Sequence, residues 1–133
     1  MIIFGSPARY VQGRGLLEQV GAELARLGSS AVLVIDPMIR ALYGEAFERS
    51  CAAASVSLTM LDFGGEASVE EIDRLEREIG VQRPAIVAAV GGGKCMDIGK
   101  ALGGRLGVRI VSIPTIASND SPRRWSGMNS RAS

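Results

Sequence analysis

The chain has 133 residues, enough for one domain with a sizeable hydrophobic core. Its net charge is only +1, because acidic and basic residues are nearly balanced. Three of the arginines lie in residues 121–133, so residues 1–120 are slightly acidic and we expect no nucleic-acid partner. No apolar run reaches the roughly 20 residues that span a bilayer, and no signal peptide is visible, so we expect a cytoplasmic protein without a membrane partner.

Histidine is absent from the sequence, which excludes a histidine-based mechanism and a histidine-ligated metal site within these residues. The two cysteines, Cys51 and Cys95, provide neither a disulfide framework nor the spacing of a metal-binding motif. We therefore expect free thiols, no metal ligands and no catalytic side chain in this chain.

The first part of the chain predicts strands alternating with helices. A short strand at residues 8–12 precedes an amphipathic helix at about 16–27, whose apolar side chains recur on one face. The run AVLVI at residues 31–35 is nearly continuous in apolar character, as is typical of a central parallel strand. Two helical segments are then expected, at about residues 37–42 and 45–54.

The alternation continues through the rest of the chain. After a strand at residues 56–61, Ser68 and Glu71 have the spacing of a capping box, which predicts a helix start. Apolar runs at residues 85–90 and 108–113 predict two further strands. The whole pattern predicts an α/β fold, with a parallel sheet and helices on both of its faces.

Three glycines, Gly91 to Gly93, join the strand at residues 85–90 to a helix. Glycine lets the backbone approach a phosphate closely, and the free N–H groups and dipole of a helix start favour an anion. Lys94 is unfavourable at the positive end of a helix unless an anion lies nearby, whereas Asp97 is favourable there without any ligand. The turn therefore predicts a bound nucleotide.

Asp36 directly follows the strand at residues 31–35. A carboxylate at the carboxyl end of a parallel strand can accept hydrogen bonds from an adenosine ribose and repels a 2′-phosphate. The same residue can instead cap a helix in which Pro37 is the first residue, and the two roles are compatible. In the Rossmann fingerprint the glycine turn comes before the acidic residue, whereas here Asp36 comes before the glycine turn.

Four ordered blocks of the sequence resemble the iron-containing (group III) alcohol dehydrogenases, and among these the glycerol dehydrogenases most. The resemblance covers residue 2 to about residue 122, nearly the whole chain. The blocks are Ser6-Pro7-x-x-Tyr10-x-Gln12-Gly13, Phe63-Gly64-Gly65-Glu66 with Glu71-Ile72-Asp73-Arg74-Leu75, Gly91-Gly92-Gly93-Lys94-x-x-Asp97-x-x-Lys100, and Pro114-Thr115-Ile116-Ala117-Ser118-Asn119-Asp120.

The resemblance implies a Rossmann-like NAD-binding domain over residues 1–120. It assigns the polyol substrate to Asp120, although an Asn-Asp pair before Ser-Pro is also typical of a simple turn. Cys95 has a second interpretation, since a cysteine near a helix start is either packed or a thiol of lowered pKa. The residues that the resemblance assigns to the cofactor are Asp36, Gly92, Gly93, Lys94, Cys95, Met96, Asp97, Thr115, Ile116, Ala117 and Ser118.

The activity implied by the resemblance is oxidation of glycerol by NAD to dihydroxyacetone, in an enzyme that is a homo-oligomer. Zinc or iron, held by one Asp and two His of a helical domain, would polarise the alcohol. This chain lacks histidine, so we expect it to be inactive alone. Residues 121–133 depart from the family pattern, and we expect them to form a flexible tail after a truncation or frameshift.

Other functions remain compatible with these residues. Within the same superfamily the alternatives are an sn-glycerol-1-phosphate dehydrogenase and a dehydroquinate synthase-like enzyme. An alternative of a different class is a stand-alone nucleotide-binding module that binds NAD without turnover. A purely structural domain would leave the glycine–lysine turn without an explanation.

Overall fold

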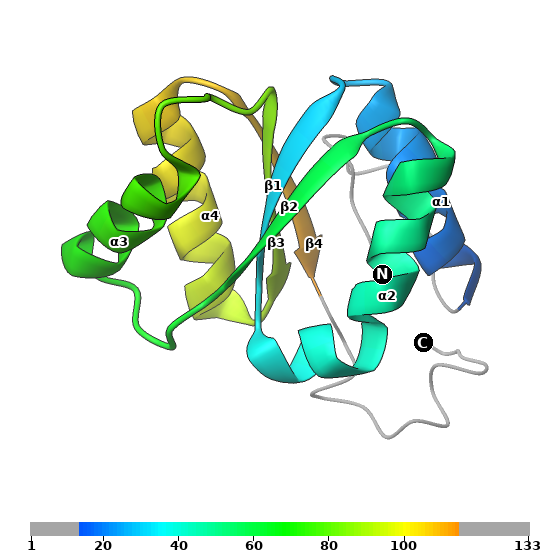
Figure 1. The fold of residues 1–133 in the computed structure, drawn as a ribbon. Helices are drawn as coiled ribbons and strands as arrows, with labels where there is room; N and C mark the ends of the chain where they lie inside the picture. The colour runs from blue at the N-terminus through cyan, green and yellow to red at the C-terminus, as the bar shows by residue number, and fades with distance from the viewer. Residues whose placement is uncertain (1–13, 115–133) are drawn as a thin grey trace.

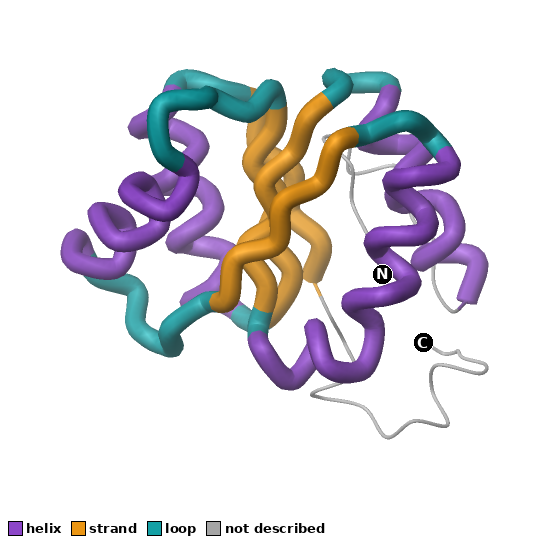
Figure 2. Tube along the Cα trace, viewed as in Figure 1, coloured by secondary structure: helices purple, strands orange, loops and turns teal. Residues whose placement is uncertain are grey.

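A computed structural model of the protein describes residues 14–114. Four parallel strands form one sheet between two layers of helices (Figure 1), and this sandwich is visible along the chain trace in Figure 2. The predicted α/β class is therefore confirmed. The strands are β1 (Ser30–Ile35), β2 (Ser57–Asp62), β3 (Ile86–Gly91) and β4 (Arg109–Pro114), and the helices are α1 (Arg14–Ala25), α2 (Pro37–Ala53), α3 (Val69–Ile79) and α4 (Gly93–Leu106).

Several predictions fall outside the described residues. They are the strand at residues 8–12, the cofactor contacts of Thr115, Ile116, Ala117 and Ser118, the substrate contact of Asp120, and the tail at residues 121–133.

The core has two halves, one on each face of the sheet, because successive side chains of a strand point to opposite faces. In β3, Ile86, Ala88 and Val90 pack against α1 and α2, whereas Val87 and Ala89 pack against α3 and α4. All five of these side chains are almost fully buried. Burial on both faces explains why the sequence of this strand is continuously apolar rather than alternating.

Helix α2 is one continuous helix, so the prediction of two segments at residues 37–42 and 45–54 is wrong. The expected break lay at Gly44, because glycine is a weak helix former. In the structure Gly44 is buried within α2, and a Cβ at this position would lie 3.7 Å from the methyl group of Met60 on β2. Packing against the sheet therefore overrides the low helix propensity of this residue.

The sheet has the order β2-β1-β3-β4, with β1 and β3 at its centre. The strand ends are level, since Ile35 at the end of β1 is paired with both Asp62 of β2 and Val90 of β3. The segments that follow these three strands consequently meet at one edge of the sheet.

In the part of the chain that the structure describes, no helix has the length and apolar character needed to cross a membrane.

Candidate functional site

The chain reverses its direction of travel across the sheet between the two central strands. From β1 it passes through α2 to β2 on one side, and later through α4 from β3 to β4 on the other. Helices α2 and α4 pack on opposite faces of the sheet, so the chain leaves the carboxyl ends of β1 and β3 in opposite directions (Figure 1). Open α/β sheets bind their ligands at such a switch point.

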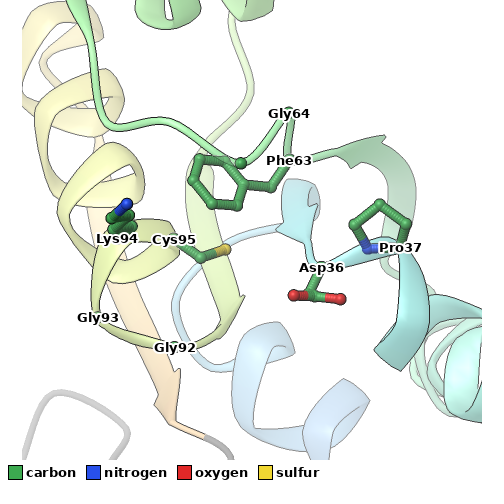
Figure 3. A pocket seen from close by; sticks show the side chains of 9 residues that line it. Asp36, Pro37, Phe63, Gly64, Gly92, Gly93, Lys94 and Cys95 are labelled. Carbon is green, nitrogen blue, oxygen red and sulfur yellow. The ribbon is translucent and has the colours of Figure 1, made fainter.

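A cavity of about 370 Å³ lies at this point, between the loops that follow β1, β2 and β3. Figure 3 shows Gly92 and Gly93 on one side of it and Asp36 and Pro37 on the other. The peptide N–H of Asp36 donates to the carbonyl of Val90 at 3.1 Å, which holds the two sides together. The cavity is lined by Asp36, Pro37, Phe63, Gly64, Gly65, Gly92, Gly93, Lys94 and Cys95.

The three glycines of the turn have different roles. Gly91 has a φ of +155°, and a Cβ there would lie 3.0 Å from the Cβ of Cys95, so this position requires glycine for structural reasons. At Gly92 and Gly93 a Cβ would meet no atom of the described residues within 4 Å. Packing within this part of the chain therefore does not require glycine at the two positions, whereas the close approach of a ligand to the backbone would.

The start of α4 has no side-chain cap. Its N-cap residue is Gly92, and among the described residues no side chain caps the N–H groups of the first turn. Such groups at a helix start normally find an acceptor in a side chain, in water or in a ligand. Together with the positive end of the helix dipole, they form a site suited to a phosphate group.

Asp36 is the N-cap residue of α2, as one of the two interpretations predicted. Its Oδ1 accepts from the peptide N–H of Met38 at 2.8 Å, and Pro37 occupies the start of the helix. The cap fixes the carboxylate at the cavity wall and leaves the second oxygen, Oδ2, free of this bond. The contact of Asp36 with a ribose remains a prediction that this geometry permits.

Lys94 extends from the first turn of α4, and its side chain is 65% exposed. Its Nζ lies 3.9 Å from Oε1 of Glu66, a still more exposed carboxylate on the loop after β2. A surface pair of this length contributes little stability. The ammonium group therefore remains available to an anion at the turn.

The side chain of Cys95 is buried beneath the glycine turn, with only 1% of its surface exposed. Its thiol donates to the carbonyl groups of Val34 and Val90, at 3.5 and 3.4 Å. Burial and, secondarily, the charge of Asp36 raise the pKa of Cys95 to about 12. The packed interpretation is therefore confirmed, and the lowered pKa is wrong.

The remaining predicted residues of α4 do not line the cavity. Met96 packs against the core on the α3 and α4 side, and Asp97 is exposed. Among residues 14–114, no group of three or more cysteine and acidic side chains is arranged to hold a metal ion. These described residues therefore do not fit the zinc or iron that the resemblance implies.

Sequence reasoning did not assign Phe63, Gly64 and Gly65 to the site, although they form one wall of the cavity. In the sequence these residues stand out only as part of a block that resembles the family. The signal that could have found them is their position directly after β2, since the carboxyl ends of neighbouring parallel strands lie at the same edge.

Fold and site together define a doubly wound α/β domain with a glycine turn and an uncapped helix start at its switch point. Residues 7–128 match the family model of the iron-containing alcohol dehydrogenases. The chain therefore belongs to that family, as its sequence blocks predicted.

Individual relatives agree with this assignment. The chain is 40% identical to the glycerol dehydrogenase of Thermotoga maritima over 87% of its own length and 31% of the relative. It is 37% identical to the glycolaldehyde reductase of Halobacterium salinarum, covering 90% of this chain and 33% of that protein. The structure of a probable glycerol dehydrogenase from Sinorhizobium meliloti superposes with a TM-score of 0.71 at 34% identity, over 92% of this chain and 33% of that one. The chain thus spans about a third of the length of the curated relatives it matches.

Proposed function

We propose that this chain forms the NAD-binding part of a dehydrogenase that oxidises a small polyol, with glycerol as the leading candidate. The observation that carries the proposal is the arrangement around one cavity. The uncapped start of α4, with Gly92 and Gly93 open to a ligand, lies on one side, and the fixed carboxylate of Asp36 lies on the other. A dinucleotide needs both a phosphate site and a ribose acceptor, at the carboxyl ends of neighbouring strands.

In this proposal each residue of the cavity has a definite task. The N–H groups at the start of α4 bind the pyrophosphate, and the ammonium group of Lys94 neutralises part of its charge. Oδ2 of Asp36 accepts from the adenosine ribose while Oδ1 keeps its capping bond. The nicotinamide ring, when bound, supplies the hydride acceptor. The resemblance suggests that residues 115–118 line the nicotinamide side and that Asp120 contacts the substrate.

The substrate class rests on the relatives. Two of the proteins named above are glycerol dehydrogenases by name and a third is a glycolaldehyde reductase, so a small hydroxylated compound is common to them. The metal ligands of the resemblance, one Asp and two His, are not all present here, because this sequence contains no histidine. We therefore propose that the chain contributes cofactor binding rather than the metal centre.

The coenzyme preference provides the direct test of this proposal. We expect the chain to bind NAD more tightly than NADP, because the charge of Asp36 repels a 2′-phosphate. Asp36→Asn should narrow this preference, since asparagine removes the charge but caps a helix about as well as aspartate. Calorimetric titration of both coenzymes into both proteins measures the two ratios. Equal affinity of the unsubstituted chain for NAD and NADP would contradict the role assigned to Asp36.

Turnover provides the second test. We expect the purified 133-residue chain to show no NADH formation from glycerol and NAD, with or without added zinc or iron, because the histidine ligands are lacking. Absorbance at the NADH band measures the rate, and a glycerol dehydrogenase from a relative serves as the positive control. Metal-dependent turnover by this chain would show that it holds a metal centre of its own.

A further inference from the structure

Glu71 is a buried carboxylate in the first turn of α3, with only 10% of its side chain exposed. The capping box predicted that it would bond back to the N–H of Ser68. One of the two hydrogen bonds of a capping box is present, since Oγ of Ser68 accepts from the N–H of Glu71 at 3.2 Å. The carboxylate of Glu71 binds a peptide group outside its helix, because its Oε2 accepts from the N–H of Gly64 at 2.7 Å. The side chain therefore binds the cavity wall instead of its own helix.

Arg74, one turn further along α3, completes this arrangement. Its Nε and Nη2 donate to the two oxygens of Glu71, at 2.9 and 2.6 Å. The same Nη2 also donates to the carbonyl of Asp62 at 2.9 Å. The peptide groups on both sides of Phe63 are thus held by one ion pair, through the carbonyl of Asp62 and the N–H of Gly64.

The hydrogen bond from Arg74 lowers the pKa of Glu71, against the opposing effect of burial. The carboxylate is consequently charged at neutral pH, and Arg74 compensates that charge. This compensation matters because the carboxylate lies directly behind a residue that lines the cavity. Without the guanidinium, an uncompensated negative charge would face the proposed phosphate site.

Phe63 is anchored independently of the ion pair, because its N–H donates to the carbonyl of Ile35 at 2.9 Å and its side chain is buried in the core, so the ion pair matters most for the two glycines that follow. Gly64 and Gly65 follow each other, Gly65 has a φ of +103°, and a Cβ on it would meet no atom within 4 Å. Two adjacent glycines lose much conformational freedom when they become fixed. A Cβ at Gly64 would lie 3.0 Å from both oxygens of Glu71, so the carboxylate also explains why glycine stands there.

We propose that Glu71 and Arg74 are positioning residues that fix the wall formed by Phe63, Gly64 and Gly65 in the shape that binds the nucleotide. The proposal rests on the proposed function, since the ligand is NAD. Preorganisation of a binding loop increases affinity because the loop does not have to be ordered when the ligand arrives. Neither residue touches the cavity itself, so each acts through the backbone of the loop.

The test compares Glu71→Gln with Glu70→Gln, a matched control on the same turn whose side chain is exposed. Glutamine keeps one acceptor oxygen, but its N–H₂ group cannot accept a hydrogen bond from Arg74 or from Gly64, so one of the two acceptors and the ion pair are lost. We expect Glu71→Gln to weaken NAD binding by about tenfold, in line with the loss of a charged hydrogen bond. Glu70→Gln should bind NAD as the unsubstituted chain does.

A second pair of variants tests the inference independently, in case Glu71→Gln does not fold. Arg74→Lys keeps the charge but loses the two-nitrogen contact that Nε and Nη2 make with the carboxylate of Glu71, and the exposed Arg77→Lys is its control. Hydrogen exchange without NAD should be faster at the N–H groups of Gly64 and Gly65 in Glu71→Gln and in Arg74→Lys, and unchanged in β3. A general loss of stability would instead accelerate exchange in β3 as well.

The outcomes separate the two proposals. The inference is overturned if both variants bind NAD as tightly as their controls, or if exchange at Gly64 is unchanged. A failure of the proposed function gives a different result, because the unsubstituted chain would then not bind NAD at all.

Discussion

Replacing Gly92 by valine is expected to abolish NAD binding while the domain stays folded. The backbone at Gly92 has a φ of −83° and a ψ of −169°, an extended conformation that valine adopts readily. A Cβ there meets no atom of residues 14–114 within 4 Å, so this part of the chain accommodates it. The added methyl groups would instead project into the space where the pyrophosphate approaches the start of α4. We expect a loss of affinity of at least about a hundredfold, which corresponds to ~3 kcal/mol.

Calorimetric titration with NAD measures the effect, and circular dichroism confirms the fold. Gly104→Val is the matched control, because Gly104 also faces open space but lies about three turns further along α4. It should bind NAD normally. Gly91→Val should behave differently again and destabilise the protein, since its φ of +155° and its contact with Cys95 exclude a side chain. Unchanged NAD affinity in folded Gly92→Val would rule out a pyrophosphate contact at this turn.

The Gly21→Ala variant is expected to be strongly destabilised, although alanine in place of glycine normally stabilises a helix by roughly 0.5–1 kcal/mol. Gly21 lies where α1 crosses α2, and its N–H donates to Oγ of Ser50 at 2.7 Å. A Cβ at this position would lie 1.9 Å from the carbonyl oxygen of Ser50. Because this neighbour is backbone, the helices themselves would have to separate, and we expect a loss of about 3 kcal/mol.

Chemical denaturation followed by circular dichroism measures the free energy of unfolding. Gly104→Ala is the control, since the same substitution in open space on α4 should raise stability by roughly 0.5–1 kcal/mol. An equal or higher stability of Gly21→Ala would mean that α1 and α2 do not pack as closely as the structure places them.

The sequence by itself determined the elements of the fold and one half of the site. The runs at residues 31–35 and 85–90 predicted central strands, because burial on both faces leaves a continuous apolar signal in the chain. Asp36 was predicted at a helix cap, and the glycine turn at a helix start, since both depend on neighbours in the sequence. The family also followed from the sequence, because its motifs are short and ordered.

The remaining features of the fold and of the site depend on contacts between segments that are distant in the sequence. The local sequence gives little indication of such contacts. The pairing of β1 with β3 places Asp36 and Gly92 around one cavity, although more than fifty residues separate them. In the sequence the three glycines of the turn cannot be told apart. The atoms that surround Gly91 in the folded chain show that this position requires glycine for structural reasons. In the same way Gly44 continues a helix because the sheet covers it.

Glu71 shows most clearly why the sequence was insufficient. Its spacing from Ser68 predicts a reciprocal cap, and that prediction weighs only the two nearest polar partners. In the folded chain Arg74 and the N–H of Gly64 bind the carboxylate instead, through charge-assisted bonds in a buried position. Gly64 lies there because β2 is paired with β1, so the loop after β2 forms the third wall of the cavity.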